Sequence, residues 1–113
     1  IAGLRRYVED LDPDIAIHMI LTPFPGTPLY DEAEAKGWIE DRNWANYDMI
    51  HAVMPTETLT TREVQEELFL CYRGFFGKLS RQIGGVLSSN QFKRRTYRYM
   101  ASQQLLRQLR GLI

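Results

Sequence analysis

Two residues capable of acid–base chemistry lie three positions apart near the middle of the chain. His51 follows Asp48, and Tyr47 directly precedes the aspartate. A carboxylate beside an imidazole can orient the ring and stabilise its protonated form, so the pair is a candidate for proton transfer or substrate contact. The alternative is a hydrogen-bonded histidine that only stabilises a loop. We therefore identify Asp48 and His51 as substrate-proximal candidates and assign no residue as catalytic.

Metal and thiol chemistry is limited by the cysteine content. The 113 residues include one cysteine, Cys71, and two histidines. A single thiol cannot form a disulfide framework, and it cannot hold a zinc or iron–sulfur centre by itself. We therefore predict no metal site in this chain and no cofactor bound by the chain alone.

The most apolar segment is followed at once by a stiff loop. Residues 15–21 are β-prone and apolar at nearly every position, which is typical of a strand covered on both faces. Residues 22–28 then contain three prolines and one glycine, which leaves few free backbone donors. No second run of this kind exists in the chain. The predicted strand therefore needs partners from outside it, unless residues 49–54 pair with it weakly.

Helices are predicted on both sides of this strand. One covers residues 4–11, and a second begins after Thr27, which can act as the N-cap, and stops at Gly37. Residues 38–55 are irregular and aromatic, with a short strand predicted at 50–53. A Thr60–Glu63 capping box then opens a long helix. Its apolar face, and that of a last helix from about residue 89, are predicted from the following positions: Val64, Leu68, Cys71 or Tyr72, Phe75, Leu79, Ile83; Phe92, Tyr99, Leu105 or Leu106, Leu109, Leu112.

These patterns predict a mostly α (α+β) fold with one or two short strands. Residues 1–55 would form the edge of a larger α/β domain, and residues 56–113 a helical C-terminal extension. We predict that the long helix breaks or bends at residues 84–85, where two glycines are adjacent. No apolar run is long enough to cross a bilayer, and the first residues do not resemble a signal peptide, so we expect a cytoplasmic protein.

Charge is distributed unevenly although the net charge is zero. All 14 acidic residues lie between Glu9 and Glu67, and nine of the 14 basic residues follow residue 67. A basic tail of this kind can dock on the acidic half of the same molecule, on a neighbouring domain, on an anionic membrane surface or on nucleic acid. Residues 92–99 also interleave basic and aromatic side chains. We rank a partner domain first, a membrane second and nucleic acid as unlikely.

The loop after the predicted strand carries a family resemblance. The series Leu-Thr-Pro-Phe-Pro-Gly-Thr-Pro-Leu-Tyr at 21–30 resembles the sixth strand and following loop of radical SAM enzymes that carry a cobalamin-binding domain. The resemblance continues through Glu-Ala-Lys-Gly-Trp-Ile at 34–39 and Trp-Ala-Asn-Tyr-Asp at 44–48, with His51 and Val53. It ends with Thr-Arg-Glu at 61–63 and Tyr-Arg-Gly-Phe-Phe at 72–76, and so covers about residues 12 to 77.

The resemblance implies a partial (β/α) barrel, of which residues 1–55 would be the C-terminal edge. The family includes the anaerobic oxidative cyclase that acts on magnesium-protoporphyrin IX monomethyl ester, hopanoid-modifying enzymes and methyltransferases. The resemblance implies a parent enzyme that binds S-adenosylmethionine, a 4Fe–4S cluster and cobalamin. The Cys-x-x-x-Cys-x-x-Cys motif that holds such a cluster is absent here, and Cys71 cannot replace it. We therefore expect a non-catalytic C-terminal fragment, whose main partner is the rest of the barrel.

Four loop residues take provisional roles from this resemblance. Residues at the C-terminal mouth of a barrel strand face the active site. Thr22, Phe24, Gly26 and Thr27 would accordingly line the S-adenosylmethionine or substrate side of the intact enzyme. The alternative for the loop is a rigid connector. The alternative for the whole chain is a small helical interaction module whose basic helix binds an anionic protein, membrane surface or nucleic acid, or one that dimerises.

Overall fold

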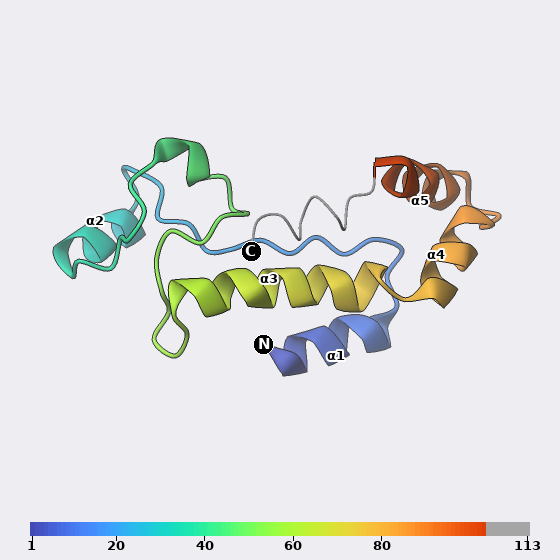
Figure 1. The fold of residues 1–113 in the computed structure, drawn as a ribbon, viewed down its shortest axis with the longest axis horizontal. Coiled ribbons are helices and arrows are strands. Elements are labelled where there is room, and N and C mark those ends of the chain that lie inside the picture. Colours follow the sequence, from blue (N-terminus) through green and yellow to red (C-terminus); the bar gives the residue numbers. More distant parts are fainter. Residues whose placement is uncertain (104–113) are drawn as a thin grey trace. The chain divides into compact units, whose positions relative to one another are not determined.

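The computed structural model describes residues 1–103, and these are mostly helical, as predicted. Its elements, shown in Figure 1, are α1 (Ala2–Leu11), α2 (Pro28–Ala35), the 3-10 helix η1 (Trp44–Asn46), α3 (Thr61–Phe76), α4 (Leu79–Val86) and α5 (Gln91–Gln103). None of these described helices is long and apolar enough to cross a membrane. The candidate apolar positions at 105, 106, 109 and 112 lie outside the described residues.

The described residues divide into two compact units. The terminal unit combines Ile1–His18 with the described residues from Phe69 onward, and the central unit is Met19–Leu68. Helix α3 begins in the central unit and ends in the terminal unit. The division predicted between residues 55 and 56 concerns the larger parent domain and stays a prediction.

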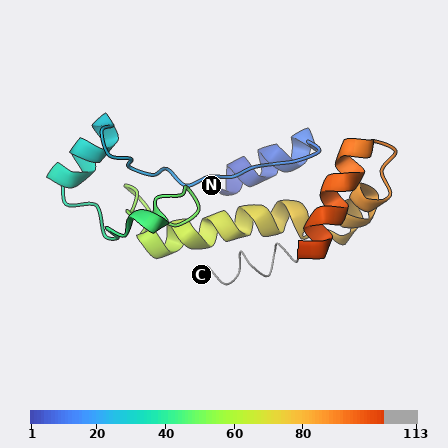
Figure 2. The ribbon, with the colours of Figure 1, turned by 90° about the horizontal axis from the view of Figure 1, so that it is seen from above.

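The terminal unit is built around two phenylalanines at the end of α3. Its buried residues are Ala16, Phe75, Phe76 and Tyr97, with α1 contributing Val8 from the side. Figures 1 and 2 show α1 lying beside the later turns of α3. Tyr72 fixes the extended chain to α3: its hydroxyl donates to the His18 carbonyl at 2.9 Å and accepts from the His18 N–H at 3.2 Å.

The central unit has a small apolar core of its own. Ala33 of α2, Ile39 and Met54 are buried together, and Leu29, Tyr30 and Trp38 pack around them. Val53 is fully buried, and its carbonyl accepts from the N–H groups of Glu40 and Asp41 at 2.9 and 3.2 Å. These bonds tie residues 39–41 to residues 53–54.

Both predicted helix starts in the central unit are confirmed. Thr27 caps α2 by accepting from the Tyr30 N–H at 3.3 Å, and Gly37, with φ of +66°, follows its last turn. Thr60 and Glu63 form the capping box of α3: the Thr60 N–H donates to the Glu63 carboxylate at 2.8 Å, and the Glu63 N–H donates to the Thr60 hydroxyl at 3.3 Å. Both are bonds within three residues, which is why the local sequence predicts them.

The strand predicted at 15–21 is extended but forms no strand pairing among the described residues. Its contact with the predicted weak partner is a single backbone hydrogen bond, from the Ile20 N–H to the Met49 carbonyl at 2.8 Å. The second predicted strand, at 50–53, is wrong. Side chains of Asp48 and Gln65 bind the backbone groups at 50–52 that a ladder would need.

The predicted helix break at residues 84–85 is also wrong. The long helix ends at Phe76, and α4 continues through both glycines. Gly85 is buried because the ring of Tyr97 lies against its Cα, so that α4 and α5 pack closely. The buried faces of α4 and α5 also differ from the predicted ones. Tyr97 is buried while Phe92 and Tyr99 are exposed, and Leu79 and Ile83 of α4 are exposed rather than continuing the α3 stripe, whose Leu68, Cys71 and Phe75 are buried.

Candidate functional site

The proline-rich loop is rigid and is held by its own hydroxyl groups. Thr22 is buried, and its hydroxyl donates to the Ile20 carbonyl at 3.1 Å. The Thr27 hydroxyl donates to the Phe24 carbonyl at 2.7 Å, which closes the turn that leads into α2. Pro23 between them is fully buried. The loop therefore has little freedom to reshape itself, and it presents a fixed surface.

Phe24 and Gly26 form the accessible part of this loop. The Phe24 side chain is partly exposed, and Gly26 adopts φ of +81°, a conformation that favours glycine. A Cβ at Gly26 would meet no atom of residues 1–103 within 4 Å, apart from its own neighbours in the chain. Space above Gly26 is therefore open, and nothing within the described residues requires a glycine there except the backbone angle.

Asp48 and His51 form the pair that their spacing predicts. The His51 Nδ1 lies 2.9 Å from the Asp48 Oδ2, while the Asp48 Oδ1 accepts from the N–H groups of Ile50 and His51, each at 2.9 Å. Met49 between them has φ of +65°, in the left-handed region. The carboxylate thus caps a tight turn and orients the imidazole at the same time.

The electrostatics of this turn favour an ionised aspartate. Partial burial acts to raise the pKa of Asp48, but hydrogen bonds from the backbone of His51 and Ile50 and from the His51 ring outweigh it and lower that pKa below its usual value. The pKa of Asp41 is lowered as well, by the Asn43 N–H first, then by the Asn46 amide, with a smaller contribution from His51. His51 thus contacts one carboxylate and contributes to the lowered pKa of a second.

Gln65 holds the turn from α3, and the sequence alone does not reveal it. Its amide Nε2 donates to the Ile50 carbonyl and its Oε1 accepts from the Ala52 N–H, both at 2.9 Å. These two bonds clamp the backbone on either side of His51. No local signal could have found the residue, because its partners lie 13 and 15 positions away in the chain.

An aromatic group borders the turn. The rings of Trp44 and Tyr47 are 4.9 Å apart between centroids, and Tyr30 of α2 lies 6.4 Å from Trp44. The Tyr47 hydroxyl donates to the Asp41 carbonyl at 3.1 Å. Trp44 stays largely exposed, so an aromatic face is available next to the Asp48–His51 pair in sequence.

A mostly apolar cleft of about 310 Å³ also opens in the central unit. Its lining residues are Ile20, Leu21, Leu29, Glu32, Trp38, Met54, Pro55, Thr56, Glu57 and Val64. The six residues assigned from the sequence, four in the loop and two in the turn, are not among them. Loop and turn are linked instead through the Ile20–Met49 backbone bond, which brings residues just before Thr22 next to the residue between Asp48 and His51.

No metal-binding cluster is found within residues 1–103. That part of the chain contains no group of three or more histidine, cysteine or acidic side chains that could hold an ion. Cys71 is buried in α3. The donor set that a three-thiolate cluster requires is missing from the composition itself, since the chain has one cysteine.

Comparison with known proteins gives two partial sequence matches. An uncharacterized methyltransferase of Pyrococcus horikoshii is 32% identical over 71 residues, which is 63% of this chain and 16% of that protein. The anaerobic magnesium-protoporphyrin IX monomethyl ester cyclase of Cereibacter sphaeroides is 30% identical over 73 residues, which is 65% of this chain and 12% of that protein. This chain is related in part to both enzymes.

The matches cover a small share of each relative. The chain spans about a sixth or less of the length of these two proteins. No family model matches the chain, and no solved structure matches it. The comparisons thus support a distant relationship to enzymes of the kind that the loop resembles, and they do not distinguish a methyltransferase from a cyclase.

Proposed function

We propose that this chain is the C-terminal part of a radical SAM enzyme that also carries a cobalamin-binding domain. In this proposal it contributes the last edge of the barrel and a helical extension, and it catalyses no reaction alone. Two observations support it at a coarse level. The loop series at 21–30 resembles that family, and two enzymes, one of them a magnesium-protoporphyrin cyclase, match about two thirds of the chain.

The observation that carries the proposal is which side chains of residues 15–21 are buried and which are exposed. Alternate side chains are buried at Ala16 and Ile20, while Ile17, Met19 and Leu21 are 70%, 62% and 67% exposed. A barrel strand that lacks its neighbouring strands, and the residues that would cover it, is expected to be extended with one apolar face buried and the other exposed. Residues 15–21 have this pattern. The segment leads directly into the rigid loop, as a barrel strand leads into an active-site loop.

The chain's own part in the chemistry would be to shape and polarise the active site. Phe24 and the open backbone at Gly26 would form a wall toward S-adenosylmethionine or substrate, with Thr22 and Thr27 fixing the wall. The Asp48–His51 pair would contact substrate or move a proton. The iron–sulfur cluster does not fit the residues present, so the cluster, like cobalamin, would be held by the rest of the parent protein.

A finer proposal concerns the parent's reaction. The match to the magnesium-protoporphyrin cyclase and the aromatic character of the turn favour the oxidative cyclase that forms the isocyclic ring of chlorophylls, in the cytoplasm. A methyltransferase is the second candidate, favoured by the other match. The basic tail would dock on the parent protein first and on an anionic membrane surface second.

The first test is the reading frame upstream of the codon for Ile1. A Cys-x-x-x-Cys-x-x-Cys motif there, preceded by a cobalamin-type domain, is the expected result. A frame that opens within a few codons of Ile1 would refute the proposal, and the alternative of a small interaction module would replace it.

A second test separates a site-facing loop from a connector. Asn tolerates positive φ, so Gly26→Asn keeps the backbone angle and adds a side chain into open space. In the full-length enzyme we expect this variant to lower 5′-deoxyadenosine formation at least about tenfold, the size of a misplaced substrate contact. Gly37→Asn, at φ of +66° after α2, is the matched control and should keep the activity. Equal activity of both variants would remove the loop from the site.

A further inference from the structure

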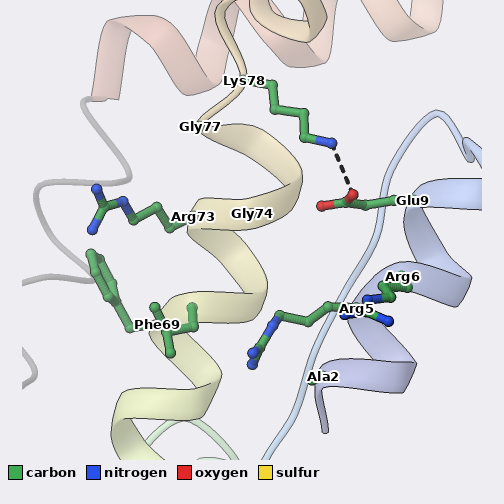
Figure 3. A pocket seen from close by; sticks show the side chains of 10 residues that line it. Ala2, Arg5, Arg6, Glu9, Phe69, Arg73, Gly74, Gly77 and Lys78 are labelled. Atoms are coloured by element: carbon green, nitrogen blue, oxygen red, sulfur yellow. Dashed lines mark ion pairs between the residues drawn. The ribbon is translucent and has the colours of Figure 1, made fainter.

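A basic cleft lies in the terminal unit, away from the turn and loop discussed above. It has a volume of about 950 Å³ and is lined by α1, the last turns of α3 and the residues that follow α3. Figure 3 shows Arg5 extending from α1 toward α3, whereas the Arg73 and Phe69 side chains project from α3 on the side away from α1. The cleft is concave, so a bound molecule would be contacted from more than one helix.

Positive charge dominates this cleft. Arg5, Arg6, Arg73 and Lys78 line it, and Glu9 is the one carboxylate among the described residues that line it. Glu9 forms an ion pair with Lys78, with 2.9 Å between Oε2 and Nζ. Neither the Arg6 nor the Arg73 side chain has an ion-pair partner within residues 1–103, and both residues are exposed. The charges of Arg6 and Arg73 are therefore not paired with an acid within residues 1–103.

Two other basic residues of the unit form ion pairs with its acidic residues. Lys93 pairs with Asp14 at 2.8 Å, and Arg81 pairs with Asp12 and donates to the Pro13 carbonyl at 3.1 Å. These cations dock on the acidic residues of the same unit, which is the intramolecular docking that the charge pattern suggested. Arg6 and Arg73 in the cleft thus differ from these paired cations, as do Arg95 and Arg98 on α5, which also have no ion-pair partner within residues 1–103.

The side chains point to phosphate as the ligand group. A guanidinium presents a planar fork of donors that matches phosphate oxygens, and two arginines on different helices suit a ligand with more than one anionic group. Phe69 and Leu70 add apolar surface to the cleft.

We propose that this basic cleft binds a soluble polyphosphate-bearing small molecule. The proposal goes beyond the function proposed above and is independent of it, since it uses neither the loop nor the Asp48–His51 turn. Phosphate groups on a lipid surface share the same chemistry, and the experiment therefore separates the two sources.

The test is calorimetric titration of the 113-residue chain with inorganic tripolyphosphate at low salt. We expect saturable binding with one site, which weakens as salt is raised. The double variant Arg6→Gln, Arg73→Gln should bind at least about tenfold more weakly, because charge-assisted hydrogen bonds are lost. Arg98→Gln is the control: Arg98 is exposed on α5 of the same unit, and its loss removes one positive charge away from the cleft.

Four results would overturn the proposal. They are the absence of saturable binding at low salt, an Arg98→Gln loss as large as that of the double variant, an unchanged affinity of the double variant, and binding to vesicles of phosphatidylserine without binding to tripolyphosphate. Circular dichroism of each variant checks that the helices are retained; these are exposed arginines, and no loss of fold is expected.

Discussion

Gln65 illustrates how one side chain can organise a site to which it contributes no reactive group. Its amide replaces, for the Ile50 carbonyl and the Ala52 N–H, the partners that a β-ladder would have supplied. His51 lies between these two bonds, and Asp48 binds its ring and its N–H from the other direction. The position of the imidazole is thus set by two side chains, one local and one from α3.

Replacing Gln65 with Ala should loosen this turn. The partly buried Ala52 N–H and the exposed Ile50 carbonyl would lose their partners, so we expect the free energy of unfolding to fall by about 0.5–1.5 kcal/mol. Hydrogen exchange at the Ala52 N–H should accelerate. Glu66→Ala is the control, since its exposed pair with Arg62 is worth about 1 kcal/mol or less. Unchanged exchange at Ala52 in the Gln65 variant would show that the clamp does not hold the turn.

Residues whose partners are close in sequence were the predictable ones. The Asp48–His51 pairing and the Thr27 cap are bonds across three positions, and residue type with spacing was enough to predict them. Gln65 was missed because its partners are 13 and 15 positions away in the chain. The residues that shape a site through tertiary contacts leave no local pattern.

At the scale of elements, α3 depends on its capping box at the N-terminal end. Hydrogen bonds from the Thr60 N–H, and then from its hydroxyl, lower the pKa of Glu63 from its ordinary value of 4.5. A lowered folded-state pKa means that the box contributes fully above about pH 4.5, and that its contribution is lost as pH falls through the lower folded value. The cap should therefore weaken in acid.

The comparison of the natural chain with Glu63→Gln tests this pH dependence. A neutral amide cannot titrate, so the variant should be less stable at neutral pH, and the difference between the two proteins should shrink as pH falls from about 5 to 3. Urea unfolding followed by circular dichroism measures both. A difference that stays constant over this range would contradict the assignment, whatever the other carboxylates do, because these are shared by both proteins.

The adjacent glycines of α4 provide a second test at this scale. A Cβ on Gly85 would overlap the Tyr97 ring, whereas a Cβ on Gly84 would meet nothing within 4 Å. We therefore expect Gly85→Ala to destabilise the terminal unit by about 1–3 kcal/mol through overpacking. Gly84→Ala should stabilise it by about 0.5–1 kcal/mol, because Ala favours the helix. Thermal unfolding of the two variants tests this prediction. Equal shifts of their unfolding temperatures would mean that α4 and α5 do not pack closely.

Composition and local pattern predicted the helices but not how they pack. Two adjacent glycines ordinarily weaken a helix, and the prediction of a break at 84–85 followed from that local preference. The contact of Gly85 with Tyr97, twelve residues later, overrides this preference. The helix is interrupted instead between Phe76 and Leu79. In the same way, the prediction of a strand at 50–53 lost to side chains that bind the same backbone groups.

At the scale of the whole molecule, the extended segment 15–21 has no strand partner within residues 1–103 and is only partly covered there. Three of its large apolar side chains are exposed, and its one bond to residues 49–54 is that between Ile20 and Met49. Unpaired extended backbone beside apolar side chains promotes association with another chain. In the proposed parent enzyme the barrel would cover this segment, and in the isolated chain a second copy can do so.

We therefore expect the isolated chain to self-associate in a concentration-dependent way, measurable by sedimentation velocity. Replacing Ile17, Met19 and Leu21 by Thr keeps the β-preference but removes the apolar face, so this variant should remain monomeric at concentrations where the natural chain associates. The matched control replaces three exposed apolar residues of α4 and its end, Leu79, Ile83 and Leu87, by Thr. Their backbone is already paired within a helix or its cap, so association should persist. A natural chain that is monomeric at high concentration would show that the segment needs no covering partner, and this would remove the main structural argument for a larger barrel.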